Sequence, residues 1–305
     1  MKILVTGGSG FIGSHLCESL AKKHEVVCFD SLITGKKENL DGIGVEFIKR
    51  DIRKPFDAKC DLIFNLASPA SPADYMGYPL ETIEVNSLGM MNVLSNARKH
   101  GARVLQASTS EIYGDPLEHP QRESYFGNVN TLGPRSCYDE SKRFAETLCH
   151  VYHEKYGVES IIVRIFNTYG ERMRVDDGRA VPSFITQALE GKPLTVFGSG
   201  NQTRSLCYVG DLVNGMEKLA FSDMGFGAFN LGNPQEITIN ELAKTILELC
   251  KSKSKIVYSP LPQDDPRRRK PDISKVRKAV SWEPEVDMIE GLKRTIKWFR
   301  ARGIV

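Results

Sequence analysis

Residues 2–13 read Lys-Ile-Leu-Val-Thr-Gly-Gly-Ser-Gly-Phe-Ile-Gly. A short β-rich apolar run over residues 2–6 precedes glycines at positions 7, 10 and 13, and a helical pattern then extends through residue 23. Gly7 permits a tight turn, Gly10 lets the backbone approach a pyrophosphate, and Gly13 lets the helix pack closely on the strand. The free N–H groups of the helix N-terminus attract phosphates. This strand, loop and helix predict a dinucleotide-binding unit.

The second predicted strand, residues 25–29, ends at Asp30, which follows Gly13 by 17 residues. An acidic residue near this distance accepts hydrogen bonds from the adenosine ribose hydroxyls and repels a 2′-phosphate. Asp30 therefore favours NAD over NADP. Lys36 and Lys37 leave NADP open, because a loop lysine can meet a phosphate.

Three further strands are predicted, and each leads to candidate site residues at its carboxyl end. The run 45–49 leads to Asp51, which either hydrogen-bonds the adenine amino group or caps the strand end. The run 61–66 leads to Ala67 and Ser68, and the run 102–107 leads to a hydroxyl-rich string at 108–114. Residues 69–78, which contain Tyr75, are expected to form a shaped loop where open α/β sheets bind ligands. A long helix is expected over residues 79–100.

Tyr138 and Lys142 lie four residues apart at the start of another long helical pattern. This spacing places both side chains on one helix face. A nearby ammonium group lowers the pKa of a phenol, so we expect Lys142 to make Tyr138 an acid–base group near neutral pH. The pair alone is weak evidence, since most pairs at this spacing lie on a solvated helix face.

Bulk composition excludes several classes of protein. The chain has 305 residues, a 41% hydrophobic fraction, a 26% charged fraction and a net charge of +3. These values predict one large α/β unit or two close-packed lobes, with no nucleic-acid partner. No apolar run approaches 18 residues, and the first residues already read as a strand, so we expect a cytoplasmic protein without membrane contact. Seven scattered cysteines predict reduced thiols, and no metal site is expected, since His150 and His153 lack zinc-binding spacing.

The second half of the chain changes character after Asn167. A polar, basic loop over 171–179 is followed by a glycine-rich loop at 198–204 that ends in Arg204, and residues 267–270 are all basic. We expect a Rossmann-type doubly wound parallel sheet with a smaller C-terminal α/β substrate lobe. The sheet domain is predicted over 1–167 plus about 205–232, and the substrate domain over 168–204 and 233–305.

Longer strings make a specific resemblance. The glycine motif, the Tyr138–Lys142 pair and Thr109 resemble the extended short-chain dehydrogenase/reductase superfamily over essentially the whole chain. Within it, the sequence resembles the UDP-glucuronate decarboxylases in these strings: Leu66-Ala-Ser-Pro-Ala-Ser-Pro72, Ser108-Thr-Ser-Glu-Ile-Tyr-Gly-Asp-Pro116, Gly133-Pro-Arg-Ser-Cys-Tyr-Asp-Glu-Ser-Lys-Arg143, Arg164-Ile-Phe-Asn-Thr-Tyr-Gly170, Gly198-Ser-Gly-Asn-Gln-Thr-Arg204 and Asp264-Asp-Pro-Arg-Arg-Arg-Lys-Pro-Asp272.

The resemblance implies roles for individual residues. The implied catalytic residues are Tyr138, Lys142, Thr109 and Glu111, and Glu111 is expected to share a side of an extended segment with Thr109. The expected NAD-binding residues are Gly7, Gly10, Phe11, Ile12, Gly13, Asp30, Ser31, Asp51, Ile52, Leu66, Ala67, Ser68, Ala107, Tyr138 and Lys142. The expected substrate-binding residues are Tyr75, Asn167, Arg179, Arg204 and Arg269, with Arg268 and Arg269 hard to separate; Arg267 and Lys270 are expected to be solvated.

The implied reaction is NAD-dependent decarboxylation of UDP-glucuronate to UDP-xylose through a 4-keto intermediate. A homodimer through helices near 80–100 and 138–156 is also implied. Glu171 departs from the family pattern and is expected to weaken the attraction of Arg172 for an anionic sugar. The alternatives are a UDP-sugar 4-epimerase and a non-catalytic NAD-sensing module, whereas a 4,6-dehydratase is disfavoured by Ser110 in place of an acid.

Overall fold

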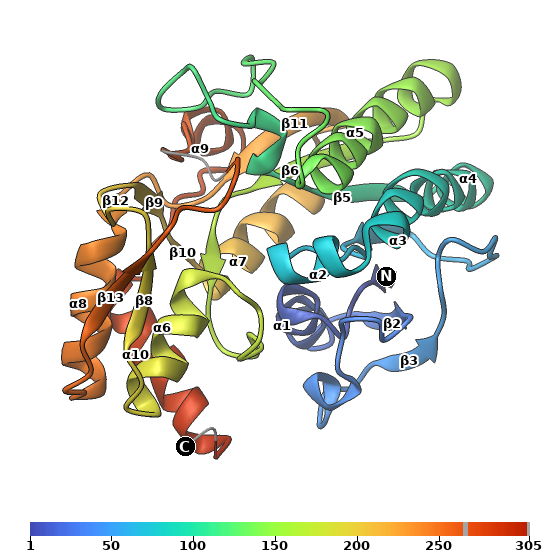
Figure 1. The fold of residues 1–305 in the computed structure, drawn as a ribbon. Helices are drawn as coiled ribbons and strands as arrows, with labels where there is room; N and C mark the ends of the chain where they lie inside the picture. The colour runs from blue at the N-terminus through green and yellow to red at the C-terminus, as the bar shows by residue number, and fades with distance from the viewer. Residues whose placement is uncertain (265–267, 304–305) are drawn as a thin grey trace.

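Seven parallel strands form the central sheet, in the order β11-β6-β5-β4-β1-β2-β3 (Figure 1). The computed structural model describes residues 1–264 and 268–303. The strands are β1 Lys2–Thr6, β2 Glu25–Asp30, β3 Glu46–Lys49, β4 Leu62–Asn65, β5 Arg103–Thr109, β6 Ser160–Ile165 and β11 Phe226–Leu231. The chain winds outward from β1 to β3 and then returns to β4 on the other side of β1. Such a reversal opens a crevice at the carboxyl ends of β1 and β4.

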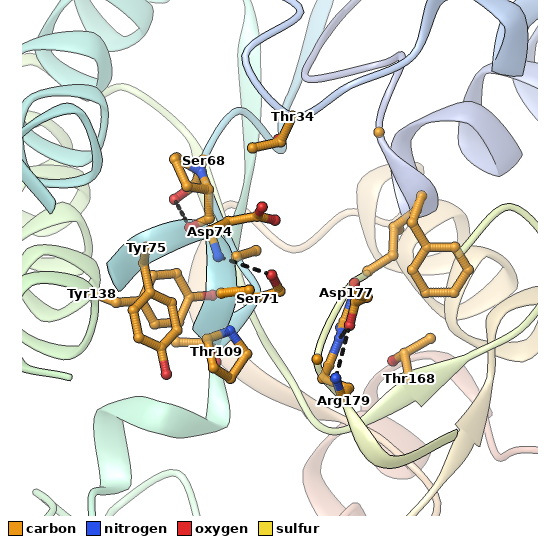
Figure 2. A pocket seen from close by; sticks show the side chains of 18 of the residues that line it. Thr34, Ser68, Ser71, Asp74, Tyr75, Thr109, Tyr138, Thr168, Asp177 and Arg179 are labelled. Atoms are coloured by element: carbon orange, nitrogen blue, oxygen red, sulfur yellow. Dashed lines mark hydrogen bonds and ion pairs between the residues drawn. The ribbon is translucent and has the colours of Figure 1, made fainter. Parts of the chain in front are cut away.

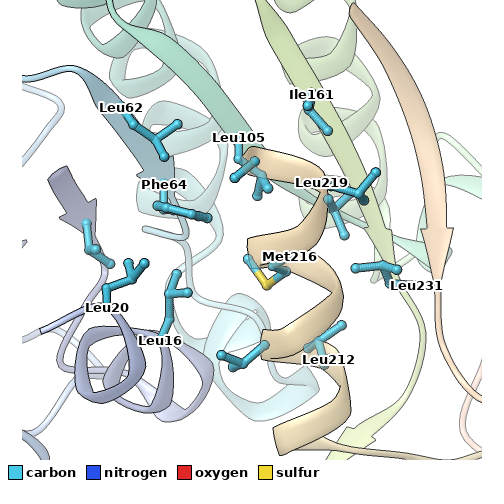
Figure 3. Packing of buried hydrophobic residues seen from close by; sticks show 14 of the residues in the cluster. Leu16, Leu20, Leu62, Phe64, Leu105, Ile161, Leu212, Met216, Leu219 and Leu231 are labelled. Carbon is cyan, nitrogen blue, oxygen red and sulfur yellow. The ribbon is translucent and has the colours of Figure 1, made fainter. Parts of the chain in front are cut away.

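Helices cover both faces of the sheet, because successive strand residues point to opposite sides. Ile3 and Val5 pack in the core that contains α1 (Phe11–Leu20) and α7 (Val209–Ala220), where Leu16, Leu212 and Met216 meet the strands (Figure 3). Leu4 packs in the opposite core with α4 (Met90–His100) and α5 (Ser136–Tyr156). This three-layer arrangement confirms the predicted doubly wound sheet.

A second lobe has its own core. Its helices are α6 Ala180–Leu189, α8 Ile239–Cys250 and α10 Met288–Ala301, and its paired strands are β7 Thr168–Tyr169 with β10 Cys207–Tyr208, β8 Leu194–Phe197 with β13 Ile256–Ser259, and β9 Thr203–Ser205 with β12 Glu236–Thr238. Phe184, Leu242 and Phe299 are buried there. Residues 273–282, with α9 Ser274–Val280, instead bury Val276 and Trp282 in the core of the sheet. This segment therefore packs with the sheet, whereas the prediction placed all of 233–305 in the substrate domain.

Two local predictions need correction. Residues 69–78 do not form a loop, because α2 occupies Pro72–Gly77. The pair Ser71-Pro72 is a sequence signal for the start of this helix. The Ser71 hydroxyl accepts a hydrogen bond from the N–H of Asp74, and Pro72 suits the first turn. The helix expected over 79–100 is also not uniform, since a π-helical turn at Val85–Gly89 separates α3 (Pro79–Glu84) from α4.

Candidate active site

One cavity of about 710 Å³ runs along the carboxyl ends of the central strands and reaches the second lobe; part of its lining is seen in Figure 2. All the site residues expected from the sequence line it, with contributions from both halves of the chain: Gly7, Gly10, Phe11, Ile12, Gly13, Asp30, Ser31, Asp51, Ile52, Leu66, Ala67, Ser68, Tyr75, Ala107, Thr109, Glu111, Tyr138, Lys142, Asn167, Arg179, Arg204 and Arg269. The fold thus brings them together, and their individual roles stay predictions.

The glycine loop is packed so closely that positions 7 and 13 have no room for a side chain. Gly7 has φ +71, and a Cβ on it would lie 2.7 Å from the backbone nitrogen of Ala67. A Cβ on Gly13 would lie 2.1 Å from the carbonyl oxygen of Gly7. The first turn of α1 is therefore held against the loop, with its N–H groups at the crevice. This cradle fits the pyrophosphate of a dinucleotide.

Asp30 stands at the end of β2, where the ribose-binding acid was expected. Its carboxylate accepts hydrogen bonds from the N–H groups of Ser9, at 2.9 Å, and Leu32, at 2.8 Å. Burial raises the pKa of Asp30, and these two hydrogen bonds act in the opposite direction. Neither Lys36 nor Lys37 is among the described residues that line the cavity, whereas Arg50 is.

Asp51 makes a local turn. Its Oδ1 accepts a hydrogen bond from the N–H of Arg53 at 2.9 Å, and its Oδ2 pairs with the Arg53 guanidinium at 2.7 Å. Burial raises the pKa of this carboxyl, but the bonds and charge of Arg53 outweigh burial and lower it. The strand-end role is thus observed, while a contact with adenine stays a prediction for the part of Asp51 that faces the cavity.

The first turns of α5 carry the tyrosine–lysine pair into the cavity. The ring of Tyr138 stacks on that of Tyr75 in α2, with centroids 4.9 Å apart and planes 10° apart (Figure 2). Lys142 donates a hydrogen bond from Nζ to the Ala107 carbonyl at 2.9 Å, and Nζ lies 5.7 Å from the Tyr138 ring centroid. Both side chains are buried, Tyr138 at 5% and Lys142 at 3% exposure.

Burial opposes the expected effect of Lys142 on Tyr138. Burial raises the pKa of Tyr138 above its usual value, and a hydrogen bond with the Thr109 side chain opposes that shift. Burial also lowers the pKa of Lys142 to about 7, so its positive charge is only partly retained at neutral pH. A buried lysine that is only partly charged supplies a weaker cationic field than the spacing suggested.

Glu111 does not lie in an extended segment beside Thr109. A 3₁₀ turn, η3, spans Ser110–Tyr113, and the Thr109 hydroxyl caps it by accepting a hydrogen bond from the N–H of Glu111 at 3.1 Å. The Glu111 carboxylate forms ion pairs with Arg135, at 2.6 Å, and with Arg269. Burial raises the pKa of Glu111, but the charges of Arg269 and Arg135 outweigh it and lower the pKa to about 2. Glu111 is therefore ionised at neutral pH.

The basic residues at positions 268–270 lie in different environments. Arg269 is 3% exposed and lines the cavity, whereas Arg268 is exposed and is not among the lining residues. Lys270 is partly exposed and pairs with Glu236 at 3.5 Å, and Arg267 lies outside the described residues.

Two other predicted cations also line the cavity, each with a local partner. The Arg179 guanidinium pairs with Asp177, and Arg204 donates to the Thr203 carbonyl at 2.9 Å. Asn167 presents its backbone carbonyl to the N–H of Cys207 at 2.9 Å, which joins the end of the sheet to the second lobe.

Glu171 does not affect the site as expected. Its carboxylate accepts hydrogen bonds from the Tyr208 hydroxyl at 2.9 and 3.0 Å, and Arg172 pairs with Glu18 of α1. Both partners come from other segments, so the sequence neighbourhood gave no signal of them. The predicted weakening of Arg172 by Glu171 is therefore not supported.

Sequence reasoning missed two arginines that shape the cavity. Arg135 precedes Tyr138 in the quoted string but was given no role. Arg174, from the basic loop, pairs with Asp74 of α2 at 2.6 Å and donates to the Thr34 carbonyl at 3.2 Å, so it bridges two walls. Among residues 1–264 and 268–303, no group of His, Cys, Asp and Glu side chains is arranged to hold a metal ion. In the same ranges, no helix is both long and apolar enough to cross a membrane.

Comparison with known proteins identifies the family. Residues 3–232 match the NAD dependent epimerase/dehydratase family. The chain is 52% identical to UDP-glucuronic acid decarboxylase 6 of Arabidopsis thaliana, over 99% of this chain and 90% of that protein. It is 51% identical to UDP-glucuronic acid decarboxylase 1 of Danio rerio, over 98% of this chain and 72% of that protein.

A solved structure shows the same fold at lower identity. It is that of UDP-glucuronic acid 4-epimerase from Bacillus cereus in complex with UDP-glucuronic acid and NAD, with a TM-score of 0.90, 28% identity and coverage of 99% of this chain and 100% of that one. The cavity, the glycine cradle and the sequence identity agree, and the chain belongs to the NAD dependent epimerase/dehydratase family, within its UDP-glucuronic acid decarboxylases.

Proposed function

We propose that this protein uses NAD to convert UDP-glucuronate to UDP-xylose and CO₂, with no net change in the cofactor. The observation that carries the proposal is the identity of about half of all residues with UDP-glucuronic acid decarboxylases across nearly the whole chain. The cavity supports it, since it joins the glycine cradle to Tyr138, Thr109 and Glu111 and then to arginines of both lobes.

The residues of the sheet hold the cofactor. Gly7, Gly10 and Gly13 receive the pyrophosphate, Asp30 accepts hydrogen bonds from the adenosine ribose, and Lys142 contacts the nicotinamide ribose. When bound, NAD supplies an acceptor for the hydride of the sugar C4 and returns that hydride after CO₂ is lost.

Tyr138 removes the proton from the sugar 4-hydroxyl. Thr109 holds the phenol oxygen through the hydrogen bond that opposes the burial-induced rise of its pKa. The resulting 4-ketone is β to the C5 carboxylate, so the C5–carboxylate bond breaks with its electron pair delocalised into the ketone as an enolate. A proton then adds at C5, and Tyr138 gives its proton back to the C4 oxygen.

Glu111 is ionised, so it accepts hydrogen bonds and does not donate a proton to C5. We assign it the orientation of the sugar or of a proton-donating water, with Arg135 and Arg269 holding its carboxylate. Arg179, Arg204, Arg269, Asn167 and Tyr75 line the part of the cavity left for the sugar nucleotide. Guanidinium groups suit the charges of a diphosphate and a carboxylate. Three of these residues, Arg179, Arg204 and Arg269, lie in the predicted substrate domain (168–204 and 233–305), which would thus supply most of the substrate contacts.

We also propose a homodimer. Helices α3 and α4 pack alongside α5 and together leave large apolar side chains exposed: Leu80 at 71%, Ile83 at 43%, Leu88 at 52%, Met91 at 42%, Phe144 at 47% and Val151 at 46%. Exposed apolar side chains that gather on neighbouring helices are typical of a protein interface. A second copy presenting the same helices would cover it in a two-fold arrangement.

The test of the reaction is a product analysis. Purified protein incubated with UDP-glucuronate and NAD should release CO₂ and form UDP-xylose in equal amounts, while absorbance at 340 nm stays flat because NADH does not accumulate. Formation of UDP-galacturonate without CO₂ would replace the proposal with a 4-epimerase. Binding of NAD with no change in any UDP-sugar would favour a non-catalytic module.

A further inference from the structure

The ion pair between Glu111 and Arg269 joins two segments that are far apart in sequence. Glu111 lies in η3, and Arg269 lies in the segment 268–272, which precedes α9. Arg269 also donates a hydrogen bond from its guanidinium to the Gly114 carbonyl at 3.1 Å. Neither segment belongs to a long helix or strand, so something else must fix one against the other.

Asn230 bonds to both segments. It lies in β11 and is fully buried. The Tyr113 hydroxyl donates to Asn230 Oδ1 at 2.8 Å, and Tyr113 is two residues beyond Glu111 in the same turn. Asn230 Nδ2 donates to the Asp272 carbonyl at 3.2 Å, and Asp272 is three residues beyond Arg269. One side-chain amide is thus hydrogen-bonded to the segment that contains Glu111 and to the segment that contains Arg269.

Gln121 extends this anchor. Asn230 Nδ2 also donates to the Gln121 carbonyl at 3.1 Å. Gln121 pairs with the segment 270–272 through three further bonds: from its N–H to the Lys270 carbonyl at 2.9 Å, from the Asp272 N–H to its carbonyl at 2.8 Å, and from the Lys270 N–H to its Oε1 at 2.8 Å. The backbone that directly follows Arg269 is therefore hydrogen-bonded to Gln121 at both Lys270 and Asp272.

We propose that Asn230 is a positioning residue, which sets Glu111 and Arg269 in register for binding of the sugar nucleotide. The side chain needs an acceptor for Tyr113 and a donor for two carbonyls, and an amide supplies both from one planar group. A carboxylate of the same size keeps the acceptor and loses the donors. The effect on binding rests on the proposed function, whereas the anchoring of the two segments does not.

The binding test uses NAD-loaded protein in a Tyr138→Phe background, which we expect to bind UDP-glucuronate without turnover. Calorimetry gives the Kd of UDP-glucuronate for this background, for Asn230→Asp, for Arg269→Ala and for the two together. Asn230→Asp should raise the Kd by roughly tenfold or more, since small displacements of substrate-positioning groups carry costs of this order. The double variant should bind no more weakly than Arg269→Ala, because residues that act through one another are non-additive.

Asn96→Asp is the matched control. Asn96 is also a buried amide, and it clamps the backbone of Ala58 by accepting from its N–H and donating to its carbonyl, both at 2.9 Å. It is not among the residues that line the cavity. Its variant should keep the Kd for UDP-glucuronate within twofold, and no variant should change the Kd for NAD by more than that.

Three outcomes overturn the proposal: a Kd within twofold of the background for Asn230→Asp, multiplying effects of Asn230→Asp and Arg269→Ala, or an equal effect of Asn96→Asp. If Asn230→Asp does not fold, Tyr113→Phe takes its place under the same criteria; it removes the hydroxyl that donates to Oδ1 and also accepts from Arg164 at 3.0 Å. Urea unfolding of the same proteins tests the anchoring without substrate. There the midpoint shifts of the Asn230 and Arg269 substitutions must be non-additive, even if the protein acts on another sugar nucleotide.

Discussion

The ring of Tyr75 stacks on the ring of Tyr138, with centroids 4.9 Å apart and planes 10° apart. Tyr75 is 1% exposed, and its hydroxyl has no hydrogen-bond partner among the described residues. The stack fixes the plane of the proposed acid–base group from a helix, α2, that is otherwise remote in sequence. The contribution of the ring can therefore be separated from that of the hydroxyl.

Tyr75→Phe keeps the stacked ring and removes a buried hydroxyl that forms no hydrogen bond with the described residues. We expect its thermal midpoint to equal or exceed that of the wild type. Tyr75→Ala removes the ring and should lower the free energy of unfolding by about 3 to 5 kcal/mol. Urea unfolding and calorimetry measure both. Equal destabilisation by the two substitutions would show that the hydroxyl, and not the ring, stabilises the fold.

Tyr138→Phe removes the group that takes the 4-hydroxyl proton. We expect turnover to fall by a factor on the order of 100 to 10,000, because general-base catalysis contributes about that much. NAD affinity should stay within a few-fold, since most of the predicted cofactor contacts come from other residues. Steady-state CO₂ release and fluorescence titration of NAD are the measurements. Turnover near the wild-type rate would remove Tyr138 from its proposed role.

Asp139 predicts a pH dependence of stability. Burial and the charge of Glu111 raise its pKa from 3.8 to about 8. The folded protein then retains a proton that the unfolded chain loses, so this group's contribution to stability is full below pH 3.8 and is lost as pH rises towards 8. Asp139→Asn has no such proton to lose.

The free energy of unfolding of Asp139→Asn, relative to the wild type, should therefore increase steadily from pH 4 to pH 8. Each unit of pKa difference corresponds to about 1.4 kcal/mol, and the sign is the expected result. Urea unfolding at pH 5, 6.5 and 8 gives the difference. A constant difference across these values would show that Asp139 is ionised in the folded protein.

Asp30 should determine the preference for NAD. We expect the wild type to bind NAD at least tenfold more tightly than NADP, because the carboxylate accepts from the ribose hydroxyls and repels a 2′-phosphate. Asp30→Asn should weaken NAD binding and narrow this ratio. Lys36→Ala is the control and should leave the ratio unchanged, since Lys36 is not among the described lining residues. A ratio that widens in Lys36→Ala would mean that the lysine contacts the 2′-phosphate of NADP.

A charged residue placed in the proposed interface should separate the dimer into monomers. Leu80 is 71% exposed, so Leu80→Glu should fold normally and yet place a charge in the interface. We expect light scattering to show a dimer for the wild type and a monomer for Leu80→Glu at micromolar concentration. Leu117→Glu, at a position 81% exposed on a loop, is the control and should remain dimeric. A monomeric wild type would contradict the proposal directly.

Local sequence determined the sheet and the floor of the site. The run 2–13 specifies strand, glycine turn and helix within one stretch, and each glycine is required by contacts close in the chain or across the neighbouring strand, such as the 2.1 Å approach of a Gly13 Cβ to Gly7. Strand ends of a parallel sheet meet at one edge, so Asp30, Ser68 and Thr109 were bound to gather there. The same logic placed Tyr138 and Lys142, because helical spacing is local.

Only the tertiary structure decided what those side chains bond to. The charge state of Glu111 depends on Arg269, which is 158 residues away in sequence, and on Arg135 at the start of α5. Burial opposes the expected effect of Lys142 on Tyr138, and the Glu171 carboxylate accepts a hydrogen bond from the Tyr208 hydroxyl. Asn230 is one residue of β11, yet it bonds to two segments that are distant in sequence. Periodicity and motifs report backbone conformation, whereas desolvation and long-range pairing exist only once the chain has folded.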